Sequence, residues 1–308
     1  MQAMALSRYG GPEVLEAMEL PEPKVGPDSV LVRTRAVGVN PVDCKIREGA
    51  LDGLIPSHFP LVPGFDVAGV VERVGPAVVG ITEGDEVVAY NRQDHLEVGT
   101  YAELTSVPQR AVTARPTTVG WAEAGALPLV GLTAYQAIVD RLGLQKGETL
   151  LVHAASGGVG TMAVQIARIL GAEVVGTAGE ANQDRVQEFG ATPVPYGDGL
   201  VERVRALHPD GVDAVLDLVG GQALDDSPAL VRDPARICSI IDPQAVLELG
   251  GAYHFCRPDA EQLATLVSWV DEGHLRIDVG RTLPLSDAAE AQRMMEQGSV
   301  TGKIVLTV

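Results

Sequence analysis

The stretch that determines the fold class reads Leu150-Leu-Val-His-Ala-Ala-Ser-Gly-Gly-Val-Gly160. An apolar run is followed by the small-residue pattern Ala155-x-Gly157-x-x-Gly160, and a helical pattern begins directly after it. Small residues suit a backbone that turns tightly and approaches a pyrophosphate, whose charge is met by N–H groups at the start of the helix. A glycine-rich hexamer alone also fits an ordinary turn, so its neighbours decide the interpretation.

Those neighbours predict alternating strands and helices. Working outward from the loop, we expect strands at 149–154, 173–177, 213–218 and 236–241, and helices at 122–142, 159–170 and 182–189. Strands separated by helices indicate a parallel, doubly wound sheet, and the strand–loop–helix–strand order is that of a Rossmann dinucleotide-binding domain. The fold class is therefore α/β.

The two ends of the chain follow another pattern. Short β-like runs at 29–35, 67–74, 85–90 and 101–107, separated by Gly and Pro, predict a mostly β region from residue 1 to about 120. Helices at 260–272 and 288–296 and a closing strand at 303–308 are expected in the tail.

Composition excludes several classes of function. The 308 residues carry a net charge of −18, with 23 Lys+Arg against 41 Asp+Glu, so no nucleic acid partner is expected. No apolar run reaches the length of about 20 residues that a membrane span requires, and no signal peptide is expected, so we predict a cytoplasmic protein. Its three cysteines are far apart in sequence and fit reduced thiols.

Several motifs extend the interpretation over the whole chain. They are Asn40-Pro-Val-Asp-Cys-Lys-Ile-Arg47, Pro63-Gly-Phe-Asp-Val-Ala-Gly69, Gly84-Asp-Glu-Val87, Gly131-Leu-Thr-Ala-Tyr135, the loop from Ala155 to Gly160, and Gly302-Lys-Ile-Val-Leu306. In this order they resemble the zinc-free quinone oxidoreductases, or zeta-crystallin-like proteins, of the medium-chain dehydrogenase/reductase superfamily.

The resemblance implies a domain organisation. A GroES-like, mostly β catalytic domain would consist of residues 1–120 and 246–308, and the Rossmann domain of 121–245 would be inserted between them. Nicotinamide and substrate would bind between the two domains. By analogy, two copies would form a homodimer through the edge strands of their Rossmann sheets.

Zinc ligands are missing where zinc alcohol dehydrogenases of this superfamily carry them. Asn40 stands in place of the first cysteine and Phe65 in place of the histidine, and no cysteine lies between Cys44 and Cys238 to form a structural zinc lobe. We therefore expect no metal. Without a Lewis acid, developing charge on a substrate oxygen must be met by hydrogen-bond donors.

Three residues are candidates for direct contact with substrate. Asn40 either projects toward substrate or ribose or holds its own loop as an Asx-turn. Lys45 either donates to a substrate carbonyl or is a solvated lysine on a short helix, and Tyr90 is either an aromatic wall for a planar substrate or a surface tyrosine. Asp43 is expected to be a structural carboxylate, and His153 a satisfied core histidine rather than a general base.

The expected contacts with the cofactor come from separate parts of the chain. Thr133 resembles the family threonine that faces the nicotinamide, although its hydroxyl also fits a helix start. Val219 lies in Asp217-Leu-Val-Gly-Gly221, which resembles the loop beside the nicotinamide ribose. The complete set is Thr133, Ala155, Ser156, Gly157, Gly158, Val159, Gly160, Thr177, Asn182, Arg185, Tyr196, Val219, Phe255, Arg257 and Lys303.

The end of the second Rossmann strand favours NADPH over NADH. An NAD enzyme usually places an acid there to bind both ribose hydroxyls, but this sequence has Ala178-Gly179. Thr177, Asn182 and Arg185 are near enough in sequence to donate to a 2′-phosphate, and Tyr196 matches a tyrosine near that phosphate in similar proteins. Glu180 argues for NADH.

The expected activity is NAD(P)H-dependent reduction of a quinone or an α,β-unsaturated carbonyl by direct hydride transfer without zinc. Two alternatives remain open. One is an enoyl reductase of a biosynthetic pathway, and the other is a catalytically weak protein that binds NADPH as a sensor.

Overall fold

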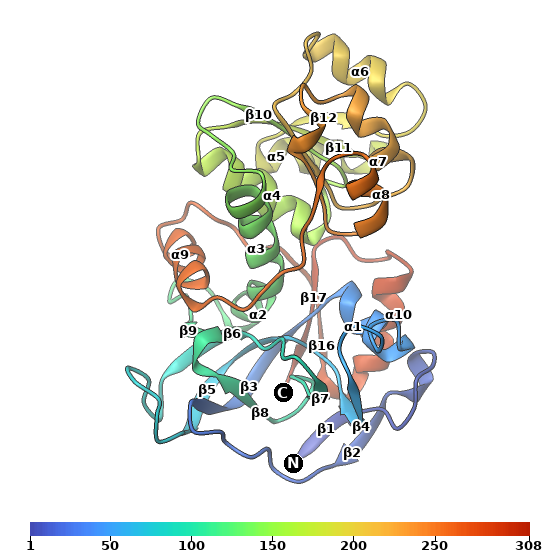
Figure 1. Ribbon diagram of the computed structural model, residues 1–308. Helices are drawn as coiled ribbons and strands as arrows, with labels where there is room; N and C mark the ends of the chain where they lie inside the picture. The colour runs from blue at the N-terminus through green and yellow to red at the C-terminus, as the bar shows by residue number, and fades with distance from the viewer. The chain divides into compact units, whose positions relative to one another are not determined.

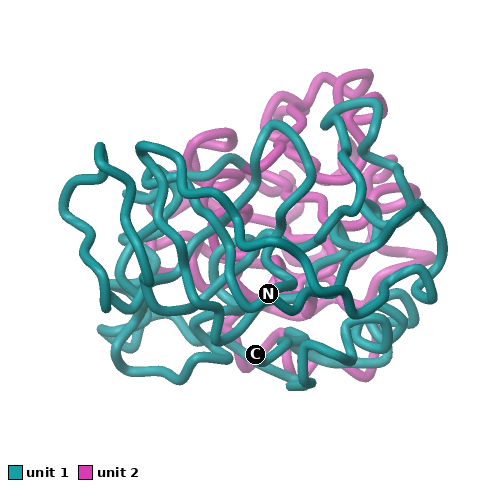
Figure 2. The backbone as a smooth tube through the Cα atoms, turned by 90° about the horizontal axis from the view of Figure 1, so that it is seen from below, with its two compact units in different colours: residues 1–129, 257–308 teal, residues 130–256 magenta.

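The computed structural model describes all residues from 1 to 308, and the chain forms two compact units. Unit 1 comprises Met1–Leu129 and Arg257–Val308, whereas unit 2 comprises Val130–Cys256 (Figure 2). Both junctions lie later in the chain than the expected 120/121 and 245/246. At the first, helix α2 (Trp121–Ala126) packs on strands of unit 1, and at the second, the chain adds one more strand to the sheet of unit 2.

Unit 1 is built around a seven-stranded sheet. Its strands are β16 (Val279–Pro284), β17 (Lys303–Thr307), β3 (Ser29–Val39), β5 (Asp66–Val74), β6 (Glu86–Tyr90) and β9 (Val112–Ala114) in spatial order, with β8 (Leu104–Pro108) also paired to β3. All neighbours are antiparallel except β16 and β17. Alternate valines of these strands, among them Val30, Val32, Val67 and Val71, form a buried apolar cluster, as period-two strands require.

Smaller elements complete unit 1. They are the strand pairs β1 (Gln2–Ala5) with β2 (Glu16–Glu19) and β4 (Ser57–Val62) with β7 (Leu96–Val98), and the helices α1 (Pro41–Glu48), α2, α9 (Ala260–Asp271) and α10 (Ala288–Glu296). The two helices expected in the tail are therefore confirmed as α9 and α10, and the closing strand as β17.

Unit 2 contains a six-stranded parallel sheet (Figure 1). Its spatial order is β12 (Thr192–Pro195), β11 (Glu173–Ala178), β10 (Thr149–Val152), β13 (Ala214–Asp217), β14 (Ile237–Ser239) and β15 (Ala252–Tyr253). The order runs outward in both directions from β10, so the predicted doubly wound Rossmann topology is confirmed.

Helices connect these strands. They are α4 (Gly158–Ile169), α5 (Gln183–Phe189), α6 (Leu200–Leu207), α7 (Gln222–Asp226) and α8 (Pro243–Glu248), and α3 (Pro128–Tyr135) enters the unit. The single helix expected at 122–142 is wrong, because α2 ends at Ala126 and α3 begins at Pro128, after which residues 136–141 continue as a π-helix. Pro128 has no N–H to continue a hydrogen-bonded helix from α2.

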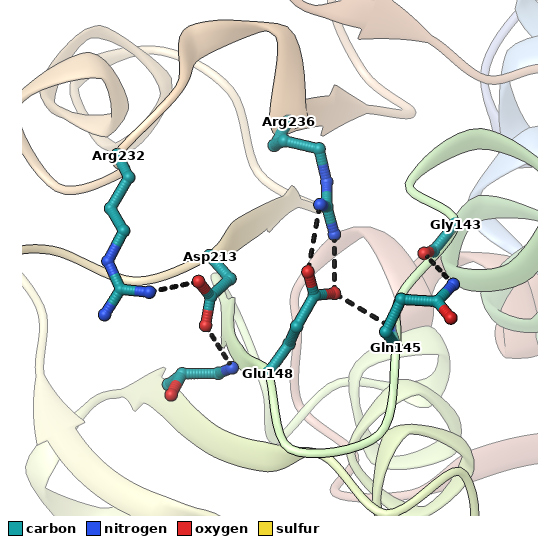
Figure 3. Close-up of polar contacts among 7 residues, drawn as sticks. Gly143, Gln145, Glu148, Asp213, Arg232 and Arg236 are labelled. Atoms are coloured by element: carbon teal, nitrogen blue, oxygen red, sulfur yellow. Dashed lines mark hydrogen bonds and ion pairs between the residues drawn. The ribbon is translucent and has the colours of Figure 1, made fainter.

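Ion pairs fix the amino ends of the central strands of unit 2 (Figure 3). Glu148, just before β10, accepts two hydrogen bonds from Arg236, which precedes β14. Asp213, just before β13, accepts from the Thr149 N–H at 2.8 Å and from Arg232. Arg236 holds the pKa of Glu148 below its usual value. The Glu148–Arg236 ion pair thus joins the starts of β10 and β14, and the Thr149–Asp213 hydrogen bond joins those of β10 and β13, at the end of the sheet opposite to its carboxyl-end loops.

None of the helices combines the length and the apolar character that a membrane crossing would demand.

Candidate functional site

The loop from His153 to Gly157 joins the carboxyl end of β10 to the start of α4. Gly157 is the N-cap, with φ −74° and ψ 175°, and no side chain caps this helix of 12 residues. The first N–H groups of a helix have no partner within it, and the helix dipole places partial positive charge there. The loop therefore presents N–H donors that suit a phosphate.

Close packing explains why small residues occupy this loop. A Cβ on Gly160 would lie 2.4 Å from the Ala154 carbonyl oxygen and 2.7 Å from the Ala155 carbonyl carbon, both of which are backbone atoms. Ala155, in the place of the first glycine, is tolerated because the residue facing it on β11 is Gly176, where a Cβ would lie 2.7 Å from that of Ala155. The helix and two strands thus approach one another as the pyrophosphate fingerprint requires.

Ala154 is the single non-glycine residue of the chain with a positive φ, 53°. Its N–H donates to the Thr177 hydroxyl at 3.2 Å, and the next N–H, of Ala155, donates to the Thr177 carbonyl at 2.9 Å. The Thr177 hydroxyl also lies 3.4 Å from Nδ1 of the buried His153. Sequence analysis missed the role of Ala154, because a left-handed alanine has no sequence signal of its own.

The carboxyl end of β11 gathers the residues expected near a 2′-phosphate. Arg185 on α5 donates from Nε to the Ser156 carbonyl at 3.2 Å and lies over the Phe189 ring. The ring of Tyr196, which is 65% exposed, approaches within 3.4 Å of the position of a Cβ on Gly179. Arg185 is thus fixed beside the glycine-rich loop, while Tyr196 covers the strand end.

Other expected contacts around β11 divide into two groups. Asn182 directly precedes α5 and is partly exposed, and Glu180 is exposed. Thr177, by contrast, is 2% exposed and its hydroxyl is engaged by Ala154 and His153. The expectation that Thr177 donates to a phosphate is therefore corrected: its side chain lies beneath the loop and supports it.

The loop after β13 is held from below by Asp217. One oxygen of this buried carboxylate accepts from the N–H groups of Val219 and Gly220 at 3.1 and 2.8 Å, and the other accepts from the Ser239 hydroxyl at 2.6 Å. The Val219 side chain is left exposed at the carboxyl edge of the sheet. This loop therefore lies at the same edge of the sheet as the glycine-rich loop.

The remaining expected contacts lie near the ends of unit 2. Thr133 is buried in α3. Phe255 is half-buried in the segment that leaves β15, whereas Arg257 is exposed in unit 1 and donates to Asp259 at 3.2 Å.

Unit 1 contains a buried polar cluster centred on Asn40, which is fully buried. The Asn40 amide donates to the Asp66 carboxylate at 2.8 Å and to the Gly38 carbonyl at 3.2 Å, and its oxygen accepts from the Lys303 ammonium. Every polar atom of the side chain is thus satisfied within unit 1. Asn40 also precedes α1 as its N-cap. These contacts hold Asn40 at the start of α1 against β5 and β17, and its contact with substrate or ribose stays a prediction.

The position of Lys303 is a correction. It was expected to contact the cofactor, but its side chain is 4% exposed and its ammonium donates to the Val39 carbonyl at 2.9 Å and to Asn40, with Asp66 3.9 Å away. Burial lowers the pKa of Lys303. A buried ammonium needs such partners, and a lysine within a strand gives no sequence signal of which partners it finds.

Two buried carboxyls share this cluster. Asp43 accepts from the Asn40 N–H at 2.8 Å and from the Tyr101 hydroxyl at 3.1 Å, while its other oxygen has no partner. Asp66 accepts from the Leu129 N–H at 2.7 Å as well as from Asn40. Burial raises the pKa of Asp43 to about 7 and that of Asp66 to about 6. Asp43 is structural, as expected.

The other substrate candidates occupy different environments. Lys45 is exposed on α1, whereas Tyr90 is buried at the end of β6 with its ring edge-on to that of Phe65, and the two ring centroids are 5.7 Å apart. The surface-tyrosine alternative for Tyr90 is therefore wrong. Phe65 stands where a zinc enzyme would carry histidine, and no group of three or more His, Cys, Asp or Glu side chains is placed to hold a metal ion.

Two family models match this chain, one in its N-terminal part and one in its C-terminal part. Residues 26–117 match the alcohol dehydrogenase GroES-like domain, and residues 189–306 match the zinc-binding dehydrogenase family.

Full-length relatives have related activities in their names. A chloroplast envelope quinone oxidoreductase homolog of Arabidopsis thaliana is 33% identical over 330 residues, covering 99% of this chain and 98% of the relative. An NADPH-dependent alkenal/one oxidoreductase of the same plant is 32% identical over 99% of this chain and 79% of its own length.

Solved structures agree with these matches. An NAD-dependent alcohol dehydrogenase superposes with a TM-score of 0.89 at 33% identity, covering 100% of both chains. A mycobacterial protein complexed with NADPH superposes with a TM-score of 0.85 at 30% identity, also over 100% of both chains.

Proposed function

The chain belongs to the quinone oxidoreductase, or zeta-crystallin-like, family of the medium-chain dehydrogenase/reductases, and we propose that it reduces a quinone or an α,β-unsaturated carbonyl with NADPH and without zinc. The observation that carries the proposal is the loop from Ala155 to Gly160, combined with Asn40 and Phe65 at the positions of zinc ligands.

The loop fits a dinucleotide. N–H groups of Gly158, Val159 and Gly160 in the first turn of α4 would meet the pyrophosphate, and the missing Cβ of Gly160 lets the helix approach β10. When bound, the nicotinamide would supply hydride to the substrate. Thr133, Val219, Phe255 and Arg257 remain proposed contacts to the nicotinamide half of the cofactor.

The preference for NADPH rests on charge at the end of β11. Ala178 and Gly179 provide no carboxylate for the ribose hydroxyls, and Arg185 brings a positive charge beside Ser156. Tyr196 and Asn182 would complete the 2′-phosphate site. The exposed Glu180 opposes this preference, and one structural neighbour is NAD-dependent. Steady-state kcat/KM for both cofactors tests the assignment, and a higher value for NADH would overturn it.

Substrate chemistry follows from the residues at the zinc-ligand positions. An amide and a phenyl ring are not zinc ligands of the usual kinds, so alkoxide formation on an unactivated alcohol would lack its Lewis acid. Quinones and enones accept hydride with weaker assistance from donors. Lys45 retains an exposed ammonium that could serve as a donor, whereas both amide hydrogens of Asn40 are used within unit 1. Tyr90 and Phe65 would supply an aromatic surface.

The deciding experiment is an assay of purified protein for oxidation of NADPH and NADH with a panel of quinones, alkenals and enoyl thioesters, with and without a chelator. We expect turnover of quinones or alkenals that the chelator leaves unchanged. Turnover confined to enoyl thioesters would favour a biosynthetic enoyl reductase. Binding of NADPH with no turnover of any acceptor would favour a sensor, and activity restored by added zinc would overturn the zinc-independent proposal.

We also propose a homodimer. Strand β15 is the last strand of the unit 2 sheet and pairs on one side only, with β14, so its other edge offers N–H and C=O groups for pairing with a second copy. Light scattering at micromolar concentration tests this, and the mass of a 32.3 kDa monomer would contradict it.

A further inference from the structure

A chain of hydrogen bonds lies beneath the glycine-rich loop, and its direction can be assigned. The Ser227 hydroxyl donates to the Ala223 carbonyl at 2.8 Å, so it accepts from His153 Nε2, which lies 3.2 Å away. Nε2 then carries the proton of a neutral ring and Nδ1 is free to accept. The Thr177 hydroxyl donates to Nδ1 and accepts from the Ala154 N–H.

The side chains in this series of hydrogen bonds are shielded from water. Relative exposure is 0% for His153 and Ser227 and 2% for Thr177. In such surroundings each bond polarises the next, and a lost partner leaves a buried polar group unsatisfied. Burial lowers the pKa of His153 to about 4, so the ring is neutral at neutral pH, as this chain of bonds requires.

The chain ends at the one strained residue of the loop. Ala154 has a φ of 53°, a conformation that is unfavourable for an alanine and needs support from its surroundings. In that conformation its carbonyl accepts from the Gly157 N–H at 3.1 Å and faces the open position at Gly160. The conformation of Ala154 therefore sets the turn from which α4 begins.

We propose that Thr177 and His153 are positioning residues for dinucleotide binding: they hold Ala154 in its left-handed conformation, and so keep the first N–H groups of α4 directed for a pyrophosphate. The proposal rests on the proposed function, because it assigns a role within the same cofactor site. Neither side chain needs to touch the cofactor for this role.

The first test compares two substitutions of one residue. Thr177→Val keeps the shape of the side chain and removes the hydroxyl, whereas Thr177→Ser keeps the hydroxyl. We expect Thr177→Val to raise the Kd for NADPH, measured by fluorescence titration, about tenfold, and Thr177→Ser to keep it within about threefold of wild type. Equal Kd values for Thr177→Val and wild type would overturn the proposal.

A second substitution separates positioning from general loss of structure. Glycine adopts a positive φ without strain, so Ala154→Gly added to Thr177→Val should recover most of the lost affinity. Adenosine 2′-monophosphate, which lacks the pyrophosphate, should bind the Thr177→Val variant as it binds wild type. A double variant no better than Thr177→Val, or equal losses for both ligands, would indicate a merely structural role and overturn the proposal.

The hydrogen-bond chain also has a spectroscopic signature. ¹⁵N chemical shifts of the His153 ring at pH 7.5 should show a neutral imidazole protonated at Nε2, and Thr177→Val should shift the Nδ1 resonance. A ring protonated at Nδ1 would contradict the assigned direction. Wild type that binds neither NADPH nor NADH would overturn the proposed function, and this signature would still report on the chain of bonds by itself.

Discussion

The Ala154 carbonyl oxygen occupies the space that a side chain at Gly160 would need, since a Cβ there would lie only 2.4 Å from it. The two residues are joined through the loop, because the left-handed φ of Ala154 directs this oxygen toward the first turn of α4. The left-handed conformation of Ala154 therefore requires a residue without a side chain at position 160.

This relationship predicts a large effect for Gly160→Ala and a small one for Gly157→Ala. The nearest atom to a Cβ on Gly157 is 3.4 Å away, an ordinary contact, and its φ of −74° suits alanine. We expect Gly160→Ala to lower the free energy of unfolding by about 1–3 kcal/mol, because backbone atoms must move, and Gly157→Ala to change it by less than about 1 kcal/mol. Urea denaturation of both variants measures the difference. Equal effects would show that the loop adapts freely to a methyl group at either position.

Buried carboxyls in unit 1 predict a stability that depends on pH. Asp43 has its pKa raised from 3.8 to about 7 by burial, so between these values the folded state binds more protons than the unfolded state. Its contribution is therefore present in acid and is lost as pH rises toward 7. Asp66, Lys303 and Tyr101 surround the carboxyl. As the pH rises from 5 to 8, we expect the free energy of unfolding of Asp43→Asn to increase by about 2 kcal/mol relative to that of wild type.

Urea denaturation at the two pH values checks this prediction. Asp85→Asn is a matched control, because this carboxyl lies in an exposed turn with Thr82. A difference between Asp43→Asn and wild type that stays constant from pH 5 to pH 8 would contradict the assignment.

The buried His153 of unit 2 predicts the opposite dependence, a stability that is lost as the pH falls. Burial lowers the pKa of His153 from 6.5 to about 4, although the charges of Asp217 and Asp226 act against this shift. The unfolded state therefore binds more protons below pH 6.5, and the contribution of a neutral His153 is lost as pH falls toward 4. As the pH falls from 7 to 4.5, the free energy of unfolding of wild type should fall by about 1–3 kcal/mol more than that of His153→Gln. Unfolding profiles that run parallel for variant and wild type would contradict it.

The sequence predicted the parallel sheet and its loop because both depend on local patterns. Apolar strands, glycine positions and helix periodicity lie within about 30 residues of one another in a βαβ unit. The site's supports depend instead on distant partners: His153 meets Ser227, and Asn40 meets Lys303. No periodicity links such pairs. Lys303 was for this reason assigned to the cofactor when it belongs to a buried cluster, and Asp66 was overlooked although a carboxylate in an apolar strand is itself a signal.

Arg185 provides the sharpest test of cofactor preference. Its guanidinium lies beside the glycine-rich loop, held through the Ser156 carbonyl at 3.2 Å, and Ala178 and Gly179 at the end of β11 offer no carboxylate to the ribose hydroxyls. A 2′-phosphate would gain a charge-assisted hydrogen bond there, worth about 1.5–3 kcal/mol, and a ribose hydroxyl much less. We expect Arg185→Ala to lower kcat/KM for NADPH about tenfold to a hundredfold, and that for NADH by less than about threefold.

Arg185→Ala removes a positive charge from the cofactor site, and Glu180→Gln tests the removal of a negative charge from the same place. Glu180 is exposed just beyond Gly179, and its carboxylate should repel a 2′-phosphate while favouring a free ribose. Glu180→Gln should therefore raise kcat/KM for NADPH and leave or lower that for NADH, whereas Arg185→Lys should retain most of the NADPH activity because it keeps the charge. Steady-state rates with a single quinone acceptor give both ratios. Equal losses toward NADPH and NADH in Arg185→Ala would mean that Arg185 serves only the loop, through Ser156, and that its charge does not select the cofactor.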